Sequence, residues 1–262
     1  TIHDGKLYLG TNRGVFYHNW DSLNKGNSSQ KFKLVPGTQG QVWSLEVIDG
    51  TLFCGHNSGV FIIENNKAQL LSDVQGGWTF IKPKGTRDLV ICGTYTFLVK
   101  FERKNGKWSK GKQIEGFKES ARYLVNANQN SIWITHGYKG VFRPFFNPGY
   151  DSVVKIDFYD SKNGFPSNKD ISVFEISNRT VFTTGKGIYK YLEDSNKFVV
   201  DEYFASRISR SDVNILKEDE KGNIWYFTPE KAGVFRIQED GYYTEVEIPF
   251  RVLNEKFLKW FQ

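Results

Sequence analysis

The sequence predicts an all-β fold, a β-propeller of four-stranded antiparallel blades, with about six blades visible in the 262 residues. The first observation is a glycine that recurs through the chain just before a hydrophobic strand. Its positions are Gly14, Gly59, Gly140, Gly187 and Gly233, and Thr96 takes its place in the third unit. The steps between these positions are 45, 37, 44, 47 and 46 residues. A period of about 40–50 residues with several strands per unit is typical of propeller blades.

The second observation is the content of one unit, which is clearest in the second blade. Four strands are predicted there, at residues 42–48, 51–56, 60–65 and 66–72. The turns between them carry Asp-Gly and Asn-Ser-Gly, and these residue types adopt the positive φ angles of tight hairpins easily. Hydrophobic residues alternate along the strands, which indicates sheets that are buried against neighbours.

The third observation is the aromatic content of 16%. An aromatic residue follows the turn position by two residues in five units, as Phe16, Phe61, Phe142, Tyr189 and Phe235. A four-stranded sheet needs a neighbour to cover each face, and blades stacked around an axis provide one. We therefore expect these aromatic residues to pack between blades rather than to bind a ligand.

The repeats divide the chain into approximate blades. The blades are residues 1–34, 35–77, 78–117, 118–164, 165–206 and 207–250, with residues 251–262 starting or closing a blade. Residues 6–34 supply the last three strands of the first blade but not its first strand. Either the final segment closes a six-bladed ring, or the array is cut from a seven-bladed or longer propeller. The second alternative is favoured because position 262 falls within a unit. We expect one propeller domain over residues 1–262 that is a fragment of a larger protein, with no helix of ten residues except residues 253–262.

Charge and cysteine content narrow the function classes. The net charge is +6, from 35 basic and 29 acidic residues, and no run of five like charges occurs. A solvated basic surface is favoured over a nucleic-acid site, which usually carries a basic helix or arm. No apolar stretch reaches the length of about 18 residues that a membrane helix needs. Cys54 and Cys92 occupy equivalent strand positions, where buried free thiols are favoured over a disulfide.

The motifs resemble a known family. The pattern "GNIW…GVFR", together with "GFPSN" at residues 164–168, resembles the two-component-regulator propeller repeat. The resemblance covers all six units, most weakly residues 78–110, and Phe165 stands where the family usually has leucine. It implies the periplasmic sensor region of an inner-membrane protein, followed by a triple-tyrosine domain, a membrane helix and either a histidine kinase or a DNA-binding module. None of those later modules is present in these residues, and many members of the family respond to oligosaccharides.

No motif for catalysis, metal binding or cofactor binding is found, so no catalytic residue, metal ligand or cofactor is predicted. The four histidines have no metal-ligand spacing, and a metal shared by His56 and His136 is disfavoured against polar turn residues. The loops entering the innermost strands and those joining second to third strands should form one face that binds ligands. The candidate ligand-binding residues are Arg13, His56, Tyr95, Arg122, His136, Tyr138, Asp170 and Arg210. Trp43 and Trp78 are interpreted as inner-strand packing.

The leading hypothesis is an extracytoplasmic ligand-sensing domain, responsive to an oligosaccharide or another small molecule and not itself catalytic. A propeller hydrolase or lyase acting on glycans and a protein-interaction scaffold are the alternatives. The predicted partners are the ligand and the triple-tyrosine-type domain of the parent chain, with a homodimer left open and no nucleic-acid contact by this domain.

Overall fold

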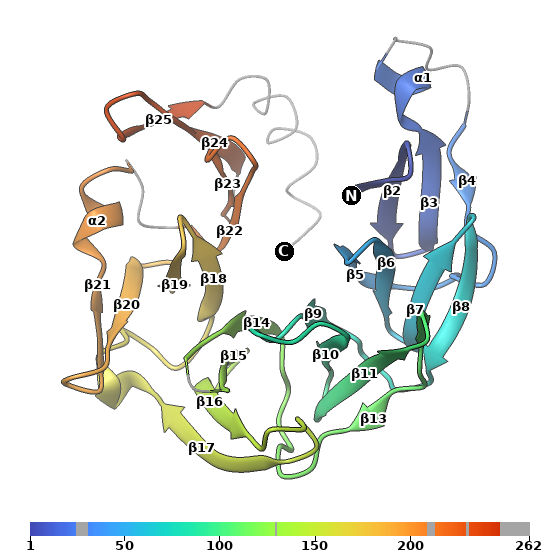
Figure 1. The fold of residues 1–262 in the computed structure, drawn as a ribbon. Coiled ribbons are helices and arrows are strands. Elements are labelled where there is room, and N and C mark those ends of the chain that lie inside the picture. Colours follow the sequence, from blue (N-terminus) through green and yellow to red (C-terminus); the bar gives the residue numbers. More distant parts are fainter. Residues whose placement is uncertain (25–30, 129, 209–212, 229–230, 247–262) are drawn as a thin grey trace. The chain divides into compact units, whose positions relative to one another are not determined.

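The computed structural model describes residues 1–24, 31–128, 130–208, 213–228 and 231–246. It contains 53% strand and 5% helix, and its six antiparallel sheets are the blades of a six-bladed β-propeller. The predicted fold class is therefore confirmed. Within five of the blades the strands are neighbours in chain order (Figure 1), and blade 3 departs from this order at its outer edge.

The first three blades come from the N-terminal half of the chain. Blade 1 contains β1 (Ile2–His3), β2 (Lys6–Thr11), β3 (Gly14–Asn19) and β4 (Lys33–Leu34), with helix α1 (Trp20–Asn24) between β3 and β4. Blade 2 contains β5 (Val42–Ile48), β6 (Thr51–His56), β7 (Gly59–Glu64) and β8 (Lys67–Ser72). Blade 3 contains β9 (Thr79–Ile81), β10 (Leu89–Gly93), β11 (Leu98–Lys104), β12 (Lys107–Trp108) and β13 (Lys112–Gln113).

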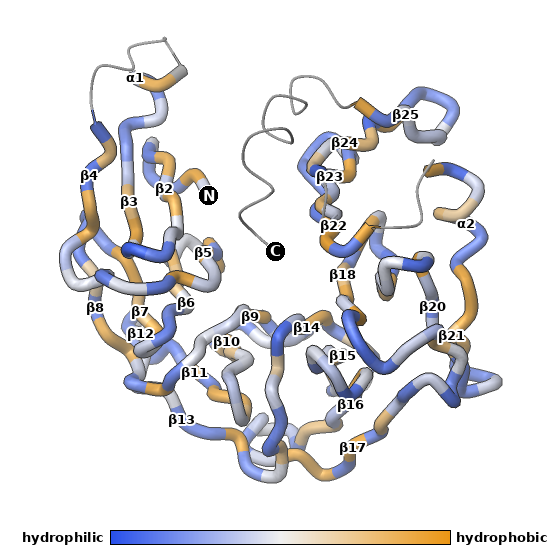
Figure 2. Tube along the Cα trace, turned by 180° about the vertical axis from the view of Figure 1, so that it is seen from behind, coloured by the Kyte–Doolittle hydropathy of each residue, from blue (hydrophilic) through white to orange (hydrophobic). Residues whose placement is uncertain are grey.

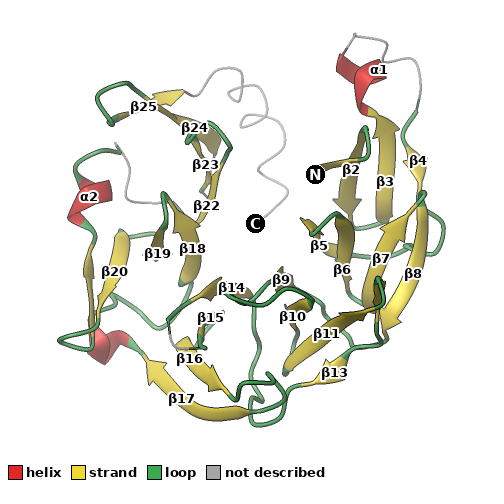
Figure 3. Ribbon diagram, viewed as in Figure 1, coloured by secondary structure: helices red, strands yellow, loops and turns green. Residues whose placement is uncertain are grey.

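The last three blades follow the same order. Blade 4 contains β14 (Tyr123–Asn126), β15 (Ile132–His136), β16 (Gly140–Phe146) and β17 (Val153–Tyr159), and the 3-10 turn η1 (Ser161–Asn163) follows it. Blade 5 contains β18 (Ser172–Ile176), β19 (Arg179–Thr183), β20 (Ile188–Leu192) and β21 (Lys197–Val200), followed by helix α2 (Glu202–Ala205). Blade 6 contains β22 (Ile215–Glu218), β23 (Ile224–Phe227), β24 (Ala232–Ile237) and β25 (Tyr243–Val246). The short helices lie in the connections outside the strands (Figure 3).

The chain forms two compact units. The first consists of Thr1–Asn126 and Phe145–Lys155, and the second of Ala127–Pro144 and the described residues from Ile156 onward. The division passes through the sequence of blade 4. Each unit is described below by itself.

Alternating residues of one strand serve two different interfaces between blades. In β6 of the first unit, Leu52 and Cys54 pack with the Tyr8 and Val15 side chains of blade 1. Phe53, which lies between them and points to the other face, packs with Phe80 and other residues of blade 3. The alternation of hydrophobic and hydrophilic stretches along the chain is visible in Figure 2. The period-2 pattern therefore builds a stack in which each blade covers the next.

The two cysteines are free and buried, as the sequence predicts. Cys54 lies in the cluster between blades 1 and 2, and Cys92 lies in the cluster between blades 2 and 3. Burial raises the pKa of the Cys54 thiol to about 12 and also raises that of Cys92. Both thiols therefore behave as small hydrophobic groups.

The aromatic residues near the turns have two packing roles. Phe61 packs against the cluster between blades 1 and 2, and Phe235 is fully buried in the cluster between blades 5 and 6. These two pack between blades, as predicted. Phe142 contacts Phe158 of its own blade, with ring centroids 4.9 Å apart.

The recurring glycine is needed because the backbone passes close to a carbonyl group. Gly14 has a φ of 126° and Gly140 a φ of 115°. A Cβ atom at Gly14 would lie 2.6 Å from the Thr38 oxygen, and one at Gly140 would lie 2.3 Å from the Tyr159 oxygen. Both the φ angle and the contact exclude a side chain at these positions.

Blade 1 has a first strand, contrary to the prediction from sequence. Ile2 and His3 of β1 pair with Leu7 and Lys6 of β2. The two strands are joined by Asp4 and Gly5, whose φ angles of 45° and 67° are those of a tight hairpin. The same Asp-Gly signal is used at residues 49–50, so the sequence contained the information that this strand exists.

Blade 3 differs from the four-strand pattern because its outermost strand is divided. Both β12 and β13 pair with β11. Between them the chain leaves the sheet edge, and the Gly111 N–H donates to the Leu71 oxygen of blade 2 at 3.3 Å. The segment 251–262, including the predicted helix at 253–262, lies outside the described residues, so its predicted roles stay predictions.

Candidate functional site

In every blade the last residue of the second strand, or the residue directly after it, has a side chain that caps the following turn. The capping residues are Thr11, His56, Thr94, His136, Thr184 and Thr228. In four blades a threonine hydroxyl accepts a hydrogen bond from a turn N–H, as such side chains commonly do in turns. The structure therefore gives this position a structural function in each blade.

His56 and His136 perform the capping function with a ring nitrogen. The Ser58 N–H donates to His56 Nδ1 at 3.0 Å, and the Tyr138 N–H donates to His136 Nδ1 at 3.1 Å. Burial lowers the pKa of His56, and the backbone groups of Gly40 and Thr38 offset part of that effect. Across the described ranges no three His, Cys, Asp or Glu side chains are grouped so that they could hold a metal ion.

Four residues of the first unit form what we term the aromatic cluster: Trp43, Trp78, Tyr95 and Arg122. Trp43 lies near the start of β5 and Trp78 immediately before β9, and their ring centroids are 4.3 Å apart at 42°. The Tyr95 ring stands edge-on to Trp43 at 6.4 Å and to Trp78 at 5.2 Å. The Arg122 guanidinium carbon lies 5.7 Å from the Trp78 ring centroid and 5.5 Å from that of Tyr123.

Tyr95 is held in place by two contacts with neighbouring segments. Its hydroxyl donates to Asn57 Oδ1 at 2.7 Å. Its ring lies against Gly76, where an added Cβ would be 2.3 Å from a ring carbon. The Gly76 N–H in turn donates to the main-chain carbonyl oxygen of Asn57 at 3.0 Å. Tyr95 therefore connects the turn of blade 2 with the turn of blade 3.

The aromatic cluster contains hydrogen-bond donors that have no acceptor. The indole Nε1 atoms of Trp43 and Trp78 are shielded from solvent and have no hydrogen-bond partner among the described residues. An unpaired buried donor destabilises a protein by about 1–3 kcal/mol, so such groups commonly mark bound water or a ligand. Two of them beside an exposed arginine make this cluster the best candidate for binding.

Predicted site residues fall into two groups. In the first unit, Tyr95 and Arg122 belong to the aromatic cluster. The main-chain oxygen of His56 accepts a hydrogen bond at 3.2 Å from the N–H of Gly77, the residue before Trp78. Arg13, also in this unit, is exposed in the turn capped by Thr11.

The second group belongs to the second unit. The His136 and Tyr138 rings are 5.5 Å apart, and the Asp170 N–H donates to the Gly137 oxygen at 3.2 Å. Tyr138 is 74% exposed. Arg210 lies outside the described residues.

Trp43 and Trp78 make contacts beyond the inner-strand packing that the sequence predicts. They do pack on each other, as an inner-strand interpretation requires, but they also contact Tyr95, and Trp78 contacts Arg122. The signal in the sequence is "GGW" at residues 76–78, because Gly76 leaves room for the Tyr95 ring.

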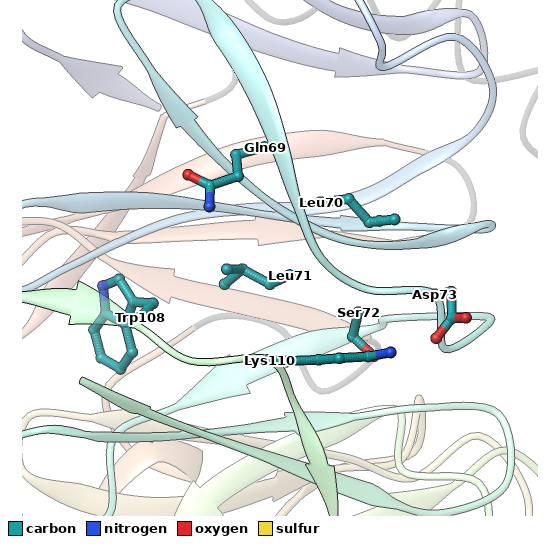
Figure 4. Close-up of a pocket in the computed structure, with 7 residues that line it drawn as sticks. All are labelled: Gln69, Leu70, Leu71, Ser72, Asp73, Trp108 and Lys110. Atoms are coloured by element: carbon teal, nitrogen blue, oxygen red, sulfur yellow. The ribbon is translucent and has the colours of Figure 1, made fainter. Parts of the chain in front are cut away.

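A separate hollow lies in the first unit between the outer strands of blades 2 and 3 (Figure 4). Its volume is about 360 Å³, and its lining residues are Gln69, Leu70, Leu71, Ser72, Asp73, Trp108 and Lys110. A second hollow of about 330 Å³ shares Gln69 and Trp108. The indole N–H and the ring of Trp108 already have partners within the protein. The N–H donates to Thr51 Oγ1 at 3.0 Å, and the Arg103 guanidinium carbon lies 5.3 Å from the ring centroid. The hollow of Figure 4 therefore has fewer unpaired groups that could orient a ligand than the aromatic cluster has.

The helices in the described ranges are α1 and α2, of five and four residues, and η1 of three. None of these segments has the length and apolar character required to cross a membrane.

Comparisons with solved structures support the fold. The extracellular domain assigned to a hybrid two component system from B. thetaiotaomicron matches with a TM-score of 0.64 and 17% identity, over 93% of this chain and 33% of that one. Virginiamycin B lyase from Staphylococcus aureus matches with a TM-score of 0.61 and 12% identity, over 97% of this chain and 85% of that one. The AfRom2 CNH domain matches with a TM-score of 0.56 and 12% identity, over 92% and 80%.

These identities establish the propeller fold and nothing finer. The chain spans about a third of the length of the B. thetaiotaomicron extracellular domain that it matches. No protein-family model matches the sequence, and no curated protein matches it.

Proposed function

We propose that this chain is a ligand-sensing propeller domain of a signal-transduction protein, located outside the cytoplasm and not itself catalytic. In this proposal the aromatic cluster binds an oligosaccharide. The observation that carries the proposal is the Trp43–Trp78 pair, whose indole N–H groups are unpaired and which lies beside the exposed Arg122. Sugar rings offer apolar faces that pack on aromatic rings and hydroxyl oxygens that accept hydrogen bonds, so both properties of the cluster suit them.

Two similarities support the extracytoplasmic location. The sequence repeats resemble the two-component-regulator propeller family, and 93% of the chain superposes on the extracellular domain assigned to a hybrid two component system. By this proposal the domain is the periplasmic part of an inner-membrane protein, and its partner in the parent chain is a triple-tyrosine-type domain.

Signalling would depend on the connection that Tyr95 makes between blades. A ligand shifts a conformational equilibrium only when it binds one arrangement more tightly than another. Tyr95 joins the turns of blades 2 and 3 through Asn57 and Gly76. A ligand that contacts the aromatic cluster would stabilise one relative position of these turns and so favour one arrangement towards the following domain.

Calorimetry with a panel of neutral and acidic oligosaccharides tests the proposal. Trp43→Phe keeps an aromatic ring but removes one indole N–H, and we expect it to weaken binding about tenfold, the effect of losing one hydrogen bond. Trp108→Phe is the matched control, because it removes an indole N–H from the hollow of Figure 4. Unchanged binding by Trp43→Phe, or loss only with Trp108→Phe, would contradict the assignment of the site.

A catalytic function is the second candidate. Virginiamycin B lyase superposes on 97% of the chain. In the second unit the His136 and Tyr138 rings are in contact, and the Asp170 N–H donates to the main-chain oxygen of Gly137 between them. Incubation with polysaccharides, followed by assay for new reducing ends and unsaturated products, distinguishes the candidates. Turnover that disappears in Tyr138→Phe would replace the sensor proposal with an enzymatic one.

A further inference from the structure

We propose that the aromatic cluster selects ligands that carry a carboxylate or sulfate group, and that Arg122 is the residue that recognises this group. The inference rests on the proposed function, because it names the class of oligosaccharide that the same site takes. It follows from the balance of donors and acceptors in the cluster and from the electrostatic setting of Arg122.

The cluster presents donors almost exclusively. The two indole N–H groups of Trp43 and Trp78 are unpaired, and a guanidinium group has donors only. Asn57 uses its oxygen to accept from the Tyr95 hydroxyl, which leaves its amide N–H₂ as the remaining group. The carboxylate of Glu46, on the same strand as Trp43, accepts from Thr79 Oγ1 and the Phe80 N–H at 3.1 Å each. A ligand group rich in acceptors therefore fits this site best.

Arg122 has no acidic partner among the described residues, in contrast to Arg103 and Arg143. Arg103 pairs with Asp88 at 2.8 Å, and Arg143 pairs with Glu193 at 2.9 Å. Arg122 makes no ion pair in the part of the chain that the structure describes, and its contacts are the rings of Trp78 and Tyr123. Its charge is therefore not compensated by a neighbouring carboxylate.

The ring contacts also orient the guanidinium group. Arginine commonly lies over aromatic rings, which leaves the N–H groups at its edge for hydrogen bonds. That edge matches the two oxygens of a carboxylate or of a sulfate group. The net charge of +6 adds a weaker attraction for anions over the whole surface.

The groups of the site differ in solvent exposure, which determines the order in which a ligand contacts them. Arg122 and Asn57 are exposed, whereas the indole nitrogens of Trp43 and Trp78 are shielded. An anionic ligand would first contact the Arg122 guanidinium and the Asn57 amide. Pairing with the indole N–H groups then requires a shift of the rings, which tryptophan fluorescence would report.

The test uses matched ligand pairs and titration calorimetry on the full chain. The pairs are tri-galacturonic acid with its carboxyl-reduced neutral counterpart, and a sulfated disaccharide with its desulfated counterpart. We expect the acidic member of at least one pair to bind about 10–100-fold more tightly, the range for a hydrogen bond to a charged group. The preference should fall as salt increases.

Three variants connect the preference to Arg122. Arg122→Gln should weaken binding of the acidic member much more than binding of the neutral member and so remove the preference, because the charge contact with the acidic group is lost. Arg122→Lys should keep part of the preference, since lysine keeps the positive charge but lacks the paired N–H donors of the guanidinium group. Arg87→Gln is the control, because Arg87 is also exposed and lies outside the cluster.

The outcomes separate this inference from the proposed function. Equal affinity for the acidic and neutral members, or a preference that survives Arg122→Gln, overturns the inference and leaves the oligosaccharide site standing. Failure of every ligand to bind overturns the proposed function and the inference with it. Loss of the preference in Arg122→Gln alone, with a ligand-induced fluorescence change that Arg87→Gln retains, supports both.

Discussion

At the scale of single residues, the same side chain performs different tasks in different surroundings. Arg122 is exposed and has no acid beside it, whereas Arg143 in the second unit is only 3% exposed. The Arg143 guanidinium lies 4.8 Å from the Trp133 ring centroid, and its Nε donates to Ser131 Oγ at 3.2 Å. Its Nη1 donates to Glu193 Oε1 at 2.9 Å. Arg143 therefore connects blade 4 to the outer hairpin of blade 5.

Replacing Arg143 should destabilise the fold strongly. Arg143→Ala removes a shielded cation–π contact, two hydrogen-bonded partners and a packed aliphatic chain, so we expect the free energy of unfolding to fall by about 2–4 kcal/mol. Denaturant titration measures this value. Arg236→Ala, at an exposed position of β24, should change the stability by less than about 0.5 kcal/mol. Equal effects of the two substitutions would show that Arg143 does not connect the blades.

At the scale of one element, the hairpin between β22 and β23 is organised by a single carboxylate. Asp219 accepts hydrogen bonds from the Lys221 and Asn223 N–H groups at 2.9 and 3.0 Å, and from the Trp225 indole at 3.0 Å. Burial alone would raise the pKa of Asp219, but the hydrogen bonds from Trp225, Asn223 and Lys221 outweigh it and lower the pKa to about 2. The charged form is therefore the one that stabilises the turn.

The low pKa of Asp219 predicts a specific acid sensitivity. An unfolded aspartate has a pKa of about 3.9, so the stabilisation is complete above that pH and is lost as the pH falls towards about 2. Thermal unfolding followed between pH 5 and pH 2 should show a falling midpoint, and Asp219→Asn should flatten part of that slope. Asp194→Asn, in the exposed turn after β20, is the control. If both variants keep the wild-type slope, Asp219 does not organise the hairpin in its charged form.

Strand positions were predictable where they depend on local signals. The predicted strands of blade 2 match β5 to β8 within one residue, because alternation and Asp-Gly or Asn-Ser-Gly turns determine them locally. The division between β12 and β13 was not predictable, since it depends on the contact of Gly111 with Leu71 in another blade. The aromatic cluster was only partly predictable for the same reason. Tyr95 and Arg122 could be selected as loop residues, but the pairing of Trp43 with Trp78 arises only when two blades stack.

At the scale of the whole molecule, stability is distributed over interfaces between successive blades. Separate buried clusters join blades 1 and 2, blades 2 and 3, and blades 5 and 6. Phe53 is central to the second of these, with ring centroids 5.3 Å from Phe80 and 5.0 Å from Trp108. In repeat proteins of this kind, a change at one interface acts mainly on the neighbouring repeats.

Truncating Phe53 should therefore have a local effect. Phe53→Ala leaves a cavity in a fully buried position and should destabilise the fold by about 3–5 kcal/mol. Hydrogen exchange measured by mass spectrometry should show faster exchange in blades 2 and 3, while β22 to β25 of blade 6 keep their protection. Uniformly faster exchange in all six blades would mean that the molecule opens as one cooperative unit.

The divided outer strand of blade 3 also affects how the molecule meets other copies of itself. A long, straight strand at a sheet edge presents a row of free backbone groups that can recruit a strand from another chain and start a fibre. The edge beyond β11 is instead two pieces of two residues each, interrupted where Gly111 turns aside to blade 2. We expect this edge to be a poor template for such growth, so the division of the outer strand should hinder the formation of fibres through blade 3.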